Sequence, residues 1–128
     1  MCINPAIFGP YFWTVIHLAC LTAGTDISDE KASDMTMFFK SLPGVLPCLH
    51  CAEHLKTNLI QLPFDRLDPF RWSVQLHNNV NAQLAKKQVS YEDALKYWEE
   101  QCKDDKPPQT PWLVIILVVL VVFGMVFR

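Results

Sequence analysis

The stretch that decides the fold of this chain is residues 72–86, which read WSVQLHNNVNAQLAK. We find no convincing period-two strand pattern there. At helical spacing, His77, Asn81 and Leu84 fall on one face, and Val80 lies beside them. Polar side chains in an otherwise apolar stripe cost stability unless they find partners. The stretch therefore predicts a helix that holds either a ligand with polar groups or a network of hydrogen bonds between helices.

Four further helices are expected around this one, and no segment shows a convincing strand pattern. Ser28 and Asp68 can cap the second and fourth helices, and Ser90 opens the fifth with a pattern that resembles a capping box. Gly24 follows the first helix, as is common at helix ends. The sequence thus predicts an all-α domain, with helices at about residues 8–23, 28–41, 48–61, 69–86 and 90–102.

A Cys-x-x-Cys pair, Cys48 and Cys51, is expected at the N-terminus of the third helix. Free backbone N–H groups and the helix dipole lower the pKa of a thiol there and favour the reactive thiolate. Such a pair can form a disulfide and accept two electrons from a dithiol by exchange. The alternative is a zinc site with His50 and His54, although structural zinc normally takes further ligands from a distant segment. A thioredoxin-like site is disfavoured, because it needs βαβ units that the sequence does not show.

Composition limits the partners of the domain. The chain has 128 residues and a net charge of −2 with scattered basic residues, so nothing favours binding to nucleic acid. Five cysteines and no visible signal peptide favour a cytosol-facing protein over a secreted disulfide framework. Cys20 is expected to be a buried packing thiol. Cys2 is expected to be incidental, and the sequence does not decide whether Cys102 pairs with Cys2 or Cys20.

Residues 112–127 form an apolar tail without a charged side chain. As a helix the tail would rise about 24 Å, slightly short of a hydrocarbon core of about 30 Å. A buried core element is the alternative, but so small a domain has little room for it. Basic residues are more numerous before the tail than after it, which places the globular part on the cytosolic side. We therefore expect a globular domain over residues 1–102, a linker over 103–111 and a transmembrane tail anchor over 112–127.

Another segment, residues 9–17, places Trp13 and His17 on one face of the first helix. Alone it is typical of core packing. Taken in order, however, the three segments resemble the Erv/ALR family of FAD-linked sulfhydryl oxidases over about residues 8–102. The resemblance is carried by Gly9, Trp13 and His17, by Cys48 and Cys51, and by Trp72, His77, Asn78, Val80, Asn81, Leu84 and Lys86, with Trp98 where the family often has a tryptophan.

The resemblance implies a four-helix bundle with a short fifth helix, a homodimer, and FAD held noncovalently at the mouth of the bundle. Trp13 and His17 would approach the flavin and adenine parts of FAD. Lys86 would hold the phosphates, and Trp98 would cover the adenine face. The adenine and ribose would be held by His77, Asn78 and Asn81.

The resemblance also implies a different role for each of the two cysteines. Cys48 would meet a thiol-containing protein substrate or a thioredoxin-like carrier, and Cys51 would pass electrons to FAD. Molecular oxygen would take the electrons and leave as hydrogen peroxide. The alternative is a tail-anchored structural or zinc-stabilised adaptor without oxidase activity.

The chain departs from the cellular members of the family in two respects. Cys2 stands alone where other members have a Cys-x-x-Cys shuttle arm. Tyr91 lies near the place of a structural cysteine, so Cys102 lacks that partner. Such minimal forms resemble the oxidases of large cytoplasmic DNA viruses. This implies a role in virion assembly, at the membrane of the virion or at a host endomembrane.

Overall fold

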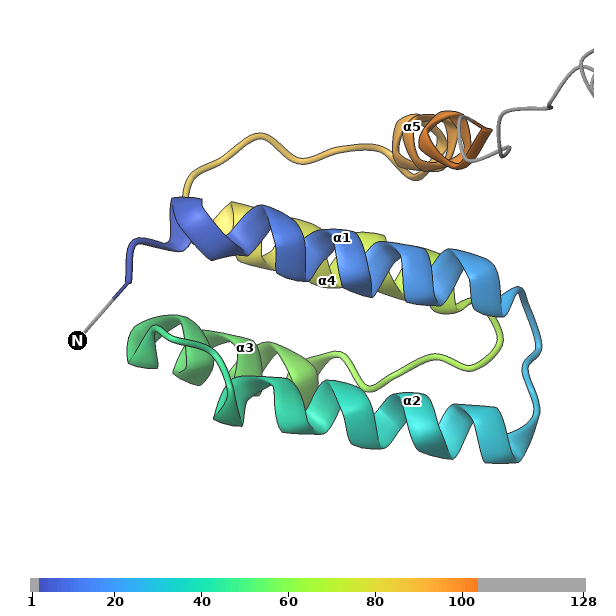
Figure 1. Ribbon diagram of the computed structural model, residues 1–128, viewed down its shortest axis with the longest axis horizontal. Coiled ribbons are helices and arrows are strands. Elements are labelled where there is room, and N and C mark those ends of the chain that lie inside the picture. Colours follow the sequence, from blue (N-terminus) through green and yellow to red (C-terminus); the bar gives the residue numbers. More distant parts are fainter. Residues whose placement is uncertain (1–2, 104–128) are drawn as a thin grey trace, which may run out of the picture. The chain divides into compact units, whose positions relative to one another are not determined.

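The computed structural model describes residues 3–103, which contain five α-helices and one short 3₁₀ helix but no β-strand. Helices α1 to α4 run in alternating directions, as the colours of Figure 1 show. Residues up to Trp98 belong to one compact unit, and the end of α5, from Glu99, belongs to another. The predicted all-α fold is confirmed, whereas the predicted tail at residues 112–127 lies outside the described residues. The elements are α1 (Pro5–Ala23), α2 (Asp29–Ser41), η1 (Leu42–Gly44), α3 (Leu49–Gln61), α4 (Pro69–Gln83) and α5 (Tyr91–Lys103).

Side-chain caps explain where the helices begin. α1 begins at Pro5, three residues before the predicted start. Asn4 Oδ1 accepts a hydrogen bond from the Ala6 N–H at 3.0 Å, and proline suits the first position of a helix. The cap at Asn4 was not predicted, whereas the three predicted caps, at Ser28, Asp68 and Ser90, are all present.

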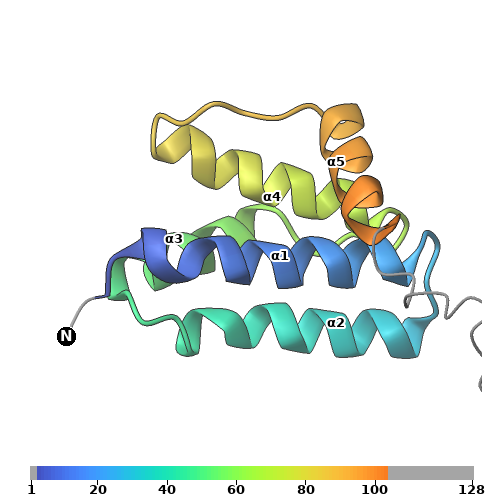
Figure 2. The same cartoon turned by 45° about the horizontal axis from the view of Figure 1, so that its top comes forward.

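α4 ends at Gln83, earlier than the predicted end at Lys86. Ala85 adopts a left-handed backbone with φ 52°, and the Lys86 N–H turns back to the Asn81 carbonyl at 2.8 Å. This conformation is unfavourable for residues other than glycine, so an alanine does not indicate it in a sequence. The following connection runs back along α4 to α5 (Figure 2).

The core contains Trp72, which is only 1% exposed. Its indole ring packs against Phe39 and Phe64, with centroids 4.6 and 5.0 Å away. Its Nε1–H donates to the Leu62 carbonyl at 3.1 Å. Because contacts with α2 and with the connection between α3 and α4 account for both the ring and its polar atom, Trp72 holds the bundle together.

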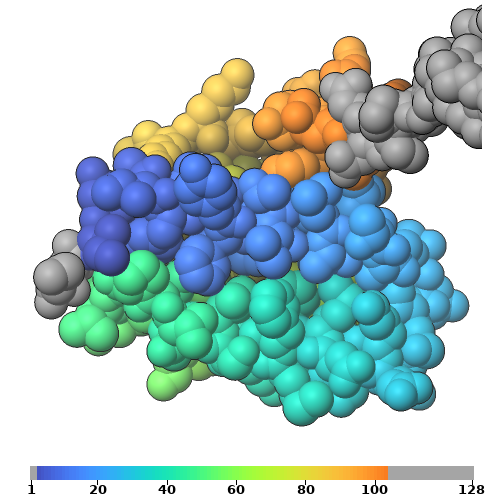
Figure 3. All heavy atoms as spheres, viewed as in Figure 1, coloured from blue at the N-terminus to red at the C-terminus, as the bar shows by residue number. Residues whose placement is uncertain are grey.

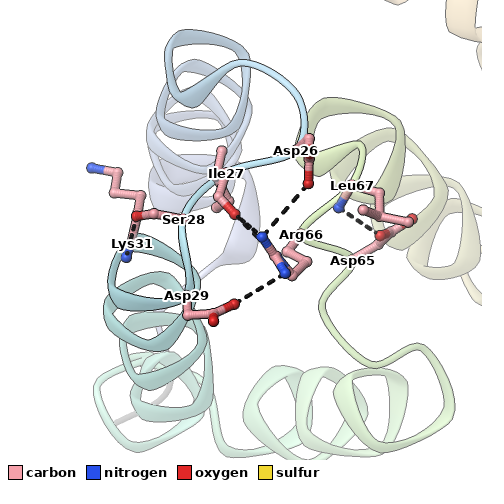
Figure 4. Close-up of polar contacts among 8 residues, drawn as sticks. All are labelled: Asp26, Ile27, Ser28, Asp29, Lys31, Asp65, Arg66 and Leu67. Carbon is pink, nitrogen blue, oxygen red and sulfur yellow. Dashed lines mark hydrogen bonds and ion pairs between the residues drawn. The ribbon is translucent and has the colours of Figure 1, made fainter.

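Arg66 joins the two connections at one end of the bundle (Figure 4). Its Nε and Nη2 atoms donate to the Ile27 carbonyl at 3.0 and 2.6 Å. The guanidinium also forms ion pairs with Asp26 at 3.5 Å and Asp29 at 3.0 Å. These contacts connect the segment between α1 and α2 to the segment between α3 and α4.

A pair of amides joins α3 to α4. Asn58 is 1% exposed, and its Nδ2 donates to Gln83 Oε1 at 3.0 Å. Gln83 Nε2 donates back to Asn58 Oδ1 at 3.3 Å. A buried amide without partners would destabilise the fold, so the reciprocal pair favours one relative placement of the two helices.

By length and apolar composition, α1 could span a membrane, a test that core helices of globular domains also meet. In this fold α1 packs against α4 and contributes the buried residues Ile16, His17 and Cys20. It is therefore a core helix of the bundle.

Candidate functional site

A cavity of about 820 Å³ lies among residues of α1, α3, α4 and the first part of α5. Small-molecule sites commonly enclose about 300–1,000 Å³ and combine apolar walls with a few polar groups. This cavity has that character, since aromatic and aliphatic side chains surround a few amides, imidazoles and one lysine. The predicted residues that line it are Gly9, Trp13, Cys51, His77, Val80, Asn81, Leu84, Lys86 and Trp98.

Gly9 leaves open space in the wall of this cavity. A Cβ atom at this position would meet no atom of another segment within 4 Å. Within its own helix Gly9 precedes Pro10, and the proline ring disfavours a helical residue with a Cβ there. The glycine therefore suits the backbone of α1 and also leaves open space at the cavity wall.

Pro10 lies inside α1 and has no N–H to donate. The carbonyl of Ala6, four residues earlier, consequently lacks its ordinary helical partner. Ala6 and Pro10 both line the cavity. The first turn of α1 thus lines the site and has one backbone hydrogen bond fewer than an uninterrupted helix.

His17 and His77 form the polar centre of the site. The indole of Trp13 stacks on His77, with centroids 3.9 Å apart and planes 6° apart. His77 Nδ1 lies 2.9 Å from His17 Nε2, and His17 Nδ1 lies 2.9 Å from Ser73 Oγ. The Ser73 hydroxyl donates to the Phe70 carbonyl at 2.7 Å. A continuous chain of hydrogen bonds therefore runs from α4 through α1 and back to α4.

Both histidines are neutral at neutral pH. Burial lowers the pKa of His17 from 6.5 to about 4, with a further contribution from His77. Burial also lowers the pKa of His77 to about 4, and the positive charge of Lys86 adds to the effect. The pair therefore presents hydrogen-bonding atoms to the site, while Lys86 supplies a positive charge at its wall.

Cys48 and Cys51 form a disulfide at the start of α3, with Cα atoms 5.2 Å apart. Cys48 caps the helix, and its Sγ accepts a hydrogen bond from the Cys51 N–H at 3.2 Å. Cys51 lines the cavity, whereas Cys48 does not and is 4% exposed. The disulfide therefore has one cysteine at the cavity and the other beside it in the protein interior.

His50 and His54 line the same cavity, with ring centroids 4.1 Å apart. Sequence reasoning considered them only as zinc ligands, although their spacing of four residues on the helix of Cys51 already placed them on one face. Within residues 3–103, no group of three or more His, Cys, Asp or Glu side chains comes together as a metal site. The disulfide also removes the two thiolates that zinc would need.

Three predicted cofactor residues do not line the larger cavity. Trp72 lies in the core, and His17 lies behind His77. The side-chain amide of Asn78 donates to the Val89 carbonyl at 2.8 Å and accepts from the Val89 N–H at 3.0 Å. Asn78 therefore fixes the connection between α4 and α5, and it lines a smaller cavity of about 340 Å³ together with His17.

The remaining described cysteines are free. Cys20 is fully buried, and burial raises the pKa of its thiol to about 12, so it is an unreactive packing residue as predicted. Cys102 is exposed, and the structure pairs it with no described residue. Cys2 lies outside the described residues.

The Erv1 / Alr family model matches residues 10–103. The chain belongs to the Erv1/Alr family. The matched range contains the cysteine pair and every predicted cofactor residue except Gly9. The resemblance seen in three short segments therefore extends over the whole helical domain.

Several relatives support this membership. The FAD-linked sulfhydryl oxidase of African swine fever virus (Tick/Malawi isolate) is 30% identical over 100 residues, which cover 73% of this chain and 81% of the viral protein. The mitochondrial FAD-linked sulfhydryl oxidase ERV1 of Saccharomyces cerevisiae is 26% identical over 96 residues, 72% of this chain and 48% of that protein. The crystal structure of the FAD binding domain of yeast Erv1 superposes with a TM-score of 0.71 at 21% identity, covering 77% of this chain and 96% of that one. That superposition confirms the fold of an Erv1/Alr domain.

Proposed function

We propose that this protein is a FAD-dependent thiol oxidase that forms disulfides in protein substrates. The observation that carries the proposal is the Cys48–Cys51 disulfide, which has Cys51 in the wall of a ligand-sized cavity. The alternative of a zinc-stabilised adaptor does not account for a disulfide at that place. Family membership and the names of the viral and yeast relatives support an oxidase.

The chain supplies the disulfide exchange itself. A substrate thiolate attacks Sγ of Cys48, a substrate–Cys48 disulfide forms, and the Cys48–Cys51 bond breaks with Cys51 leaving as a thiolate. A second substrate thiolate then attacks the substrate sulfur of that mixed disulfide, and Cys48 leaves as a thiolate. The substrate has lost two electrons and two protons, and the cysteine pair holds the two electrons. Because Cys48 is 4% exposed, the first attack requires local opening around it.

The types of residue that line the cavity are suited to binding FAD. Trp13 and Trp98 offer aromatic surfaces for flat rings, and Lys86 offers a charge for the phosphates. Gly9 leaves the space that a ring system would take. A bound flavin supplies the acceptor for the two electrons of the cysteine pair and transfers them to oxygen, which leaves as hydrogen peroxide. Cys51 is the cysteine that lines this cavity, which supports its role as the electron donor.

The purified full-length protein should be yellow, and it should consume oxygen and release hydrogen peroxide with a dithiol donor. Cys51→Ser should abolish turnover and leave flavin bound, because it removes one sulfur and little volume. Cys102→Ser is the matched control, since Cys102 is exposed and free, and it should keep full activity. A folded but colourless protein that gains no absorbance with FAD would contradict the proposal.

We further propose that the protein is a homodimer with α1 in its interface. Ile7, Tyr11 and Val15 are 64%, 74% and 53% exposed and are spaced four residues apart, so they form one apolar face of α1. Figure 3 shows α1 lying along the surface of the described domain. Exposed apolar surface of this kind commonly marks an interface. Tyr11→Lys should shift the sedimentation of the protein from dimer to monomer, and an unchanged dimer would exclude this face.

The apolar residues 112–127 support a tail anchor with the oxidase domain in the cytosol. We propose that the anchor places the enzyme at the virion membrane or a host endomembrane, where it oxidises virion proteins directly or through a thioredoxin-like carrier. The viral relatives support this role. Deleting residues 112–128 should move the protein from the membrane fraction to the soluble fraction. Equal fractionation of the two forms would contradict the anchor.

A further inference from the structure

A directed chain of hydrogen bonds ends at His77 and determines which of its ring nitrogens carries the proton. Ser73 is fully buried in α4, and its hydroxyl lies 2.7 Å from the Phe70 carbonyl. A carbonyl oxygen can only accept a hydrogen bond, so the single proton of the hydroxyl lies between these two atoms. Toward every other neighbour, Ser73 Oγ is therefore an acceptor.

His17 must then donate to Ser73, because its Nδ1 lies 2.9 Å from the hydroxyl oxygen. A neutral imidazole carries one proton, which leaves Nε2 of His17 as an acceptor. His77 Nδ1 lies 2.9 Å from that Nε2 and must donate to it. The proton of His77 is thus on Nδ1, and its Nε2 carries a lone pair. The lowered pKa values of both histidines are consistent with one proton on each ring.

The free Nε2 of His77 is accessible rather than buried. It has no hydrogen-bond partner within residues 3–103, although every buried side-chain nitrogen or oxygen there has one. Nε2 is therefore not buried, and His77 lines both the larger and the smaller cavity. Stacking on Trp13 fixes the plane of the ring, so the lone pair has a defined direction.

We propose that Ser73 is a positioning residue that acts through His17 to hold His77 as a hydrogen-bond acceptor toward the cavity. The site then selects a ligand that carries an N–H or O–H donor at this point. The inference rests on the proposed function in that the ligand is FAD, whose donors of this kind are the adenine amino group and the ribose hydroxyls. A ligand with a carbonyl oxygen there would place one lone pair against another, which is unfavourable.

The proton positions can be measured without any flavin. We would label the histidines of the full-length protein with ¹⁵N and assign the tautomers of His17 and His77 by NMR. Both rings should carry the proton on Nδ1 and none on Nε2. A proton on Nε2 of His77, or a charged ring at neutral pH, would overturn the inference. This result does not depend on whether the protein is an oxidase.

The role of Ser73 is tested by Ser73→Ala, with Ser73→Cys as a nearly isosteric second variant and Ser73→Thr as the control that keeps the hydroxyl. Loss of the acceptor should move part of the His77 proton to Nε2 in the first two variants, while the control keeps the wild-type tautomer. An unchanged tautomer in Ser73→Ala and Ser73→Cys would overturn the role of Ser73.

Ligand selection is tested with FAD, an analogue without the adenine amino group and an analogue without the ribose 2′-hydroxyl. The wild type and Ser73→Thr should bind one analogue about tenfold more weakly than FAD, which is the typical effect of losing one hydrogen bond in a shielded site. The analogue that binds more weakly identifies the ligand group that donates to His77. The difference in affinity between FAD and this analogue should largely disappear in Ser73→Ala. Equal binding of all three ligands by the wild type would overturn the selection. Failure of the wild type to bind FAD at all would instead refute the proposed function and leave the tautomer result standing.

Discussion

Replacing Gly9 should weaken the binding of the ligand while changing the stability of the fold only modestly. Alanine is favoured over glycine inside a helix by about 0.5–1 kcal/mol. The added Cβ meets no atom of another segment within 4 Å, but Gly9 precedes Pro10, whose ring disfavours a helical residue with a Cβ at this position. The two effects oppose each other. For a domain of about 100 residues, 1 kcal/mol shifts Tm by about 4–8 °C, so the Tm of flavin-free Gly9→Ala should lie within about 8 °C of the wild-type value.

The same position lines the cavity, so a side chain there takes space from the ligand. Gly9→Leu adds four carbon atoms, and forcing methylene groups into a filled site costs about 1–3 kcal/mol. FAD should bind this variant about 5- to 150-fold more weakly, and Gly9→Ala should show a smaller loss. Thermal unfolding with and without FAD, together with a fluorescence titration of the flavin, measures both effects on the same protein.

Gly44 provides the matched control, because a Cβ there also meets nothing within 4 Å and Gly44 does not line the cavity. Gly44→Ala should leave the Kd of FAD unchanged. Equal affinity for FAD in the wild type, Gly9→Ala and Gly9→Leu would refute the assignment of this cavity to the flavin. A Tm of flavin-free Gly9→Ala that is lower than the wild-type value by much more than about 8 °C would refute the open space beside Gly9.

Three further outcomes follow from the packing. The buried imidazole of His17 has a pKa of about 4 when folded against 6.5 when unfolded, so the unfolded chain binds more protons between these values. Protonation of His17 alone should consequently lower the free energy of unfolding by up to about 3 kcal/mol as the pH drops from 6.5 to 4, and His77, whose pKa is also lowered to about 4, should lower it further. Urea unfolding that is independent of pH in this window would contradict this. Asn78→Ala removes both hydrogen bonds to Val89 and should speed hydrogen exchange at the Val89 amide, an effect that an unchanged exchange rate would exclude. Gln83→Ala leaves Oδ1 of the buried Asn58 without its partner and should cost about 1–3 kcal/mol in chemical denaturation, with much of this cost absent when Asn58 is also replaced.

The fold could be predicted where local chemistry decides it. Ser28, Asp68 and Ser90 satisfy backbone N–H groups within three residues of themselves, and such caps depend little on the rest of the molecule. The face of α4 that lines the cavity could be predicted for the same reason, because helical spacing alone brings His77 and Asn81 together. The end of α4 could not be predicted, since it depends on a left-handed alanine.

The role of an individual residue could not be predicted from the sequence where it depends on contacts with a distant segment. Trp72 belongs to the core because Phe39 and Phe64 approach it from other elements. Asn78 is adjacent to His77, yet its amide is occupied by Val89 because the connection to α5 folds back along α4. Spacing along one helix does not show which neighbouring segment contacts a side chain in the folded structure.

Pro10 has a consequence for how long a ligand stays bound. Exchange of a ligand from an enclosed site requires some part of the wall to open, and the rate depends on the cost of that opening. The first turn of α1 forms part of this wall and lacks one backbone hydrogen bond, because Pro10 cannot donate to Ala6. Fraying of this turn therefore costs less than breaking an uninterrupted helix. We expect the residence time of the ligand to follow the opening of this single turn, while the amide pair and the Arg66 contacts keep the rest of the bundle closed.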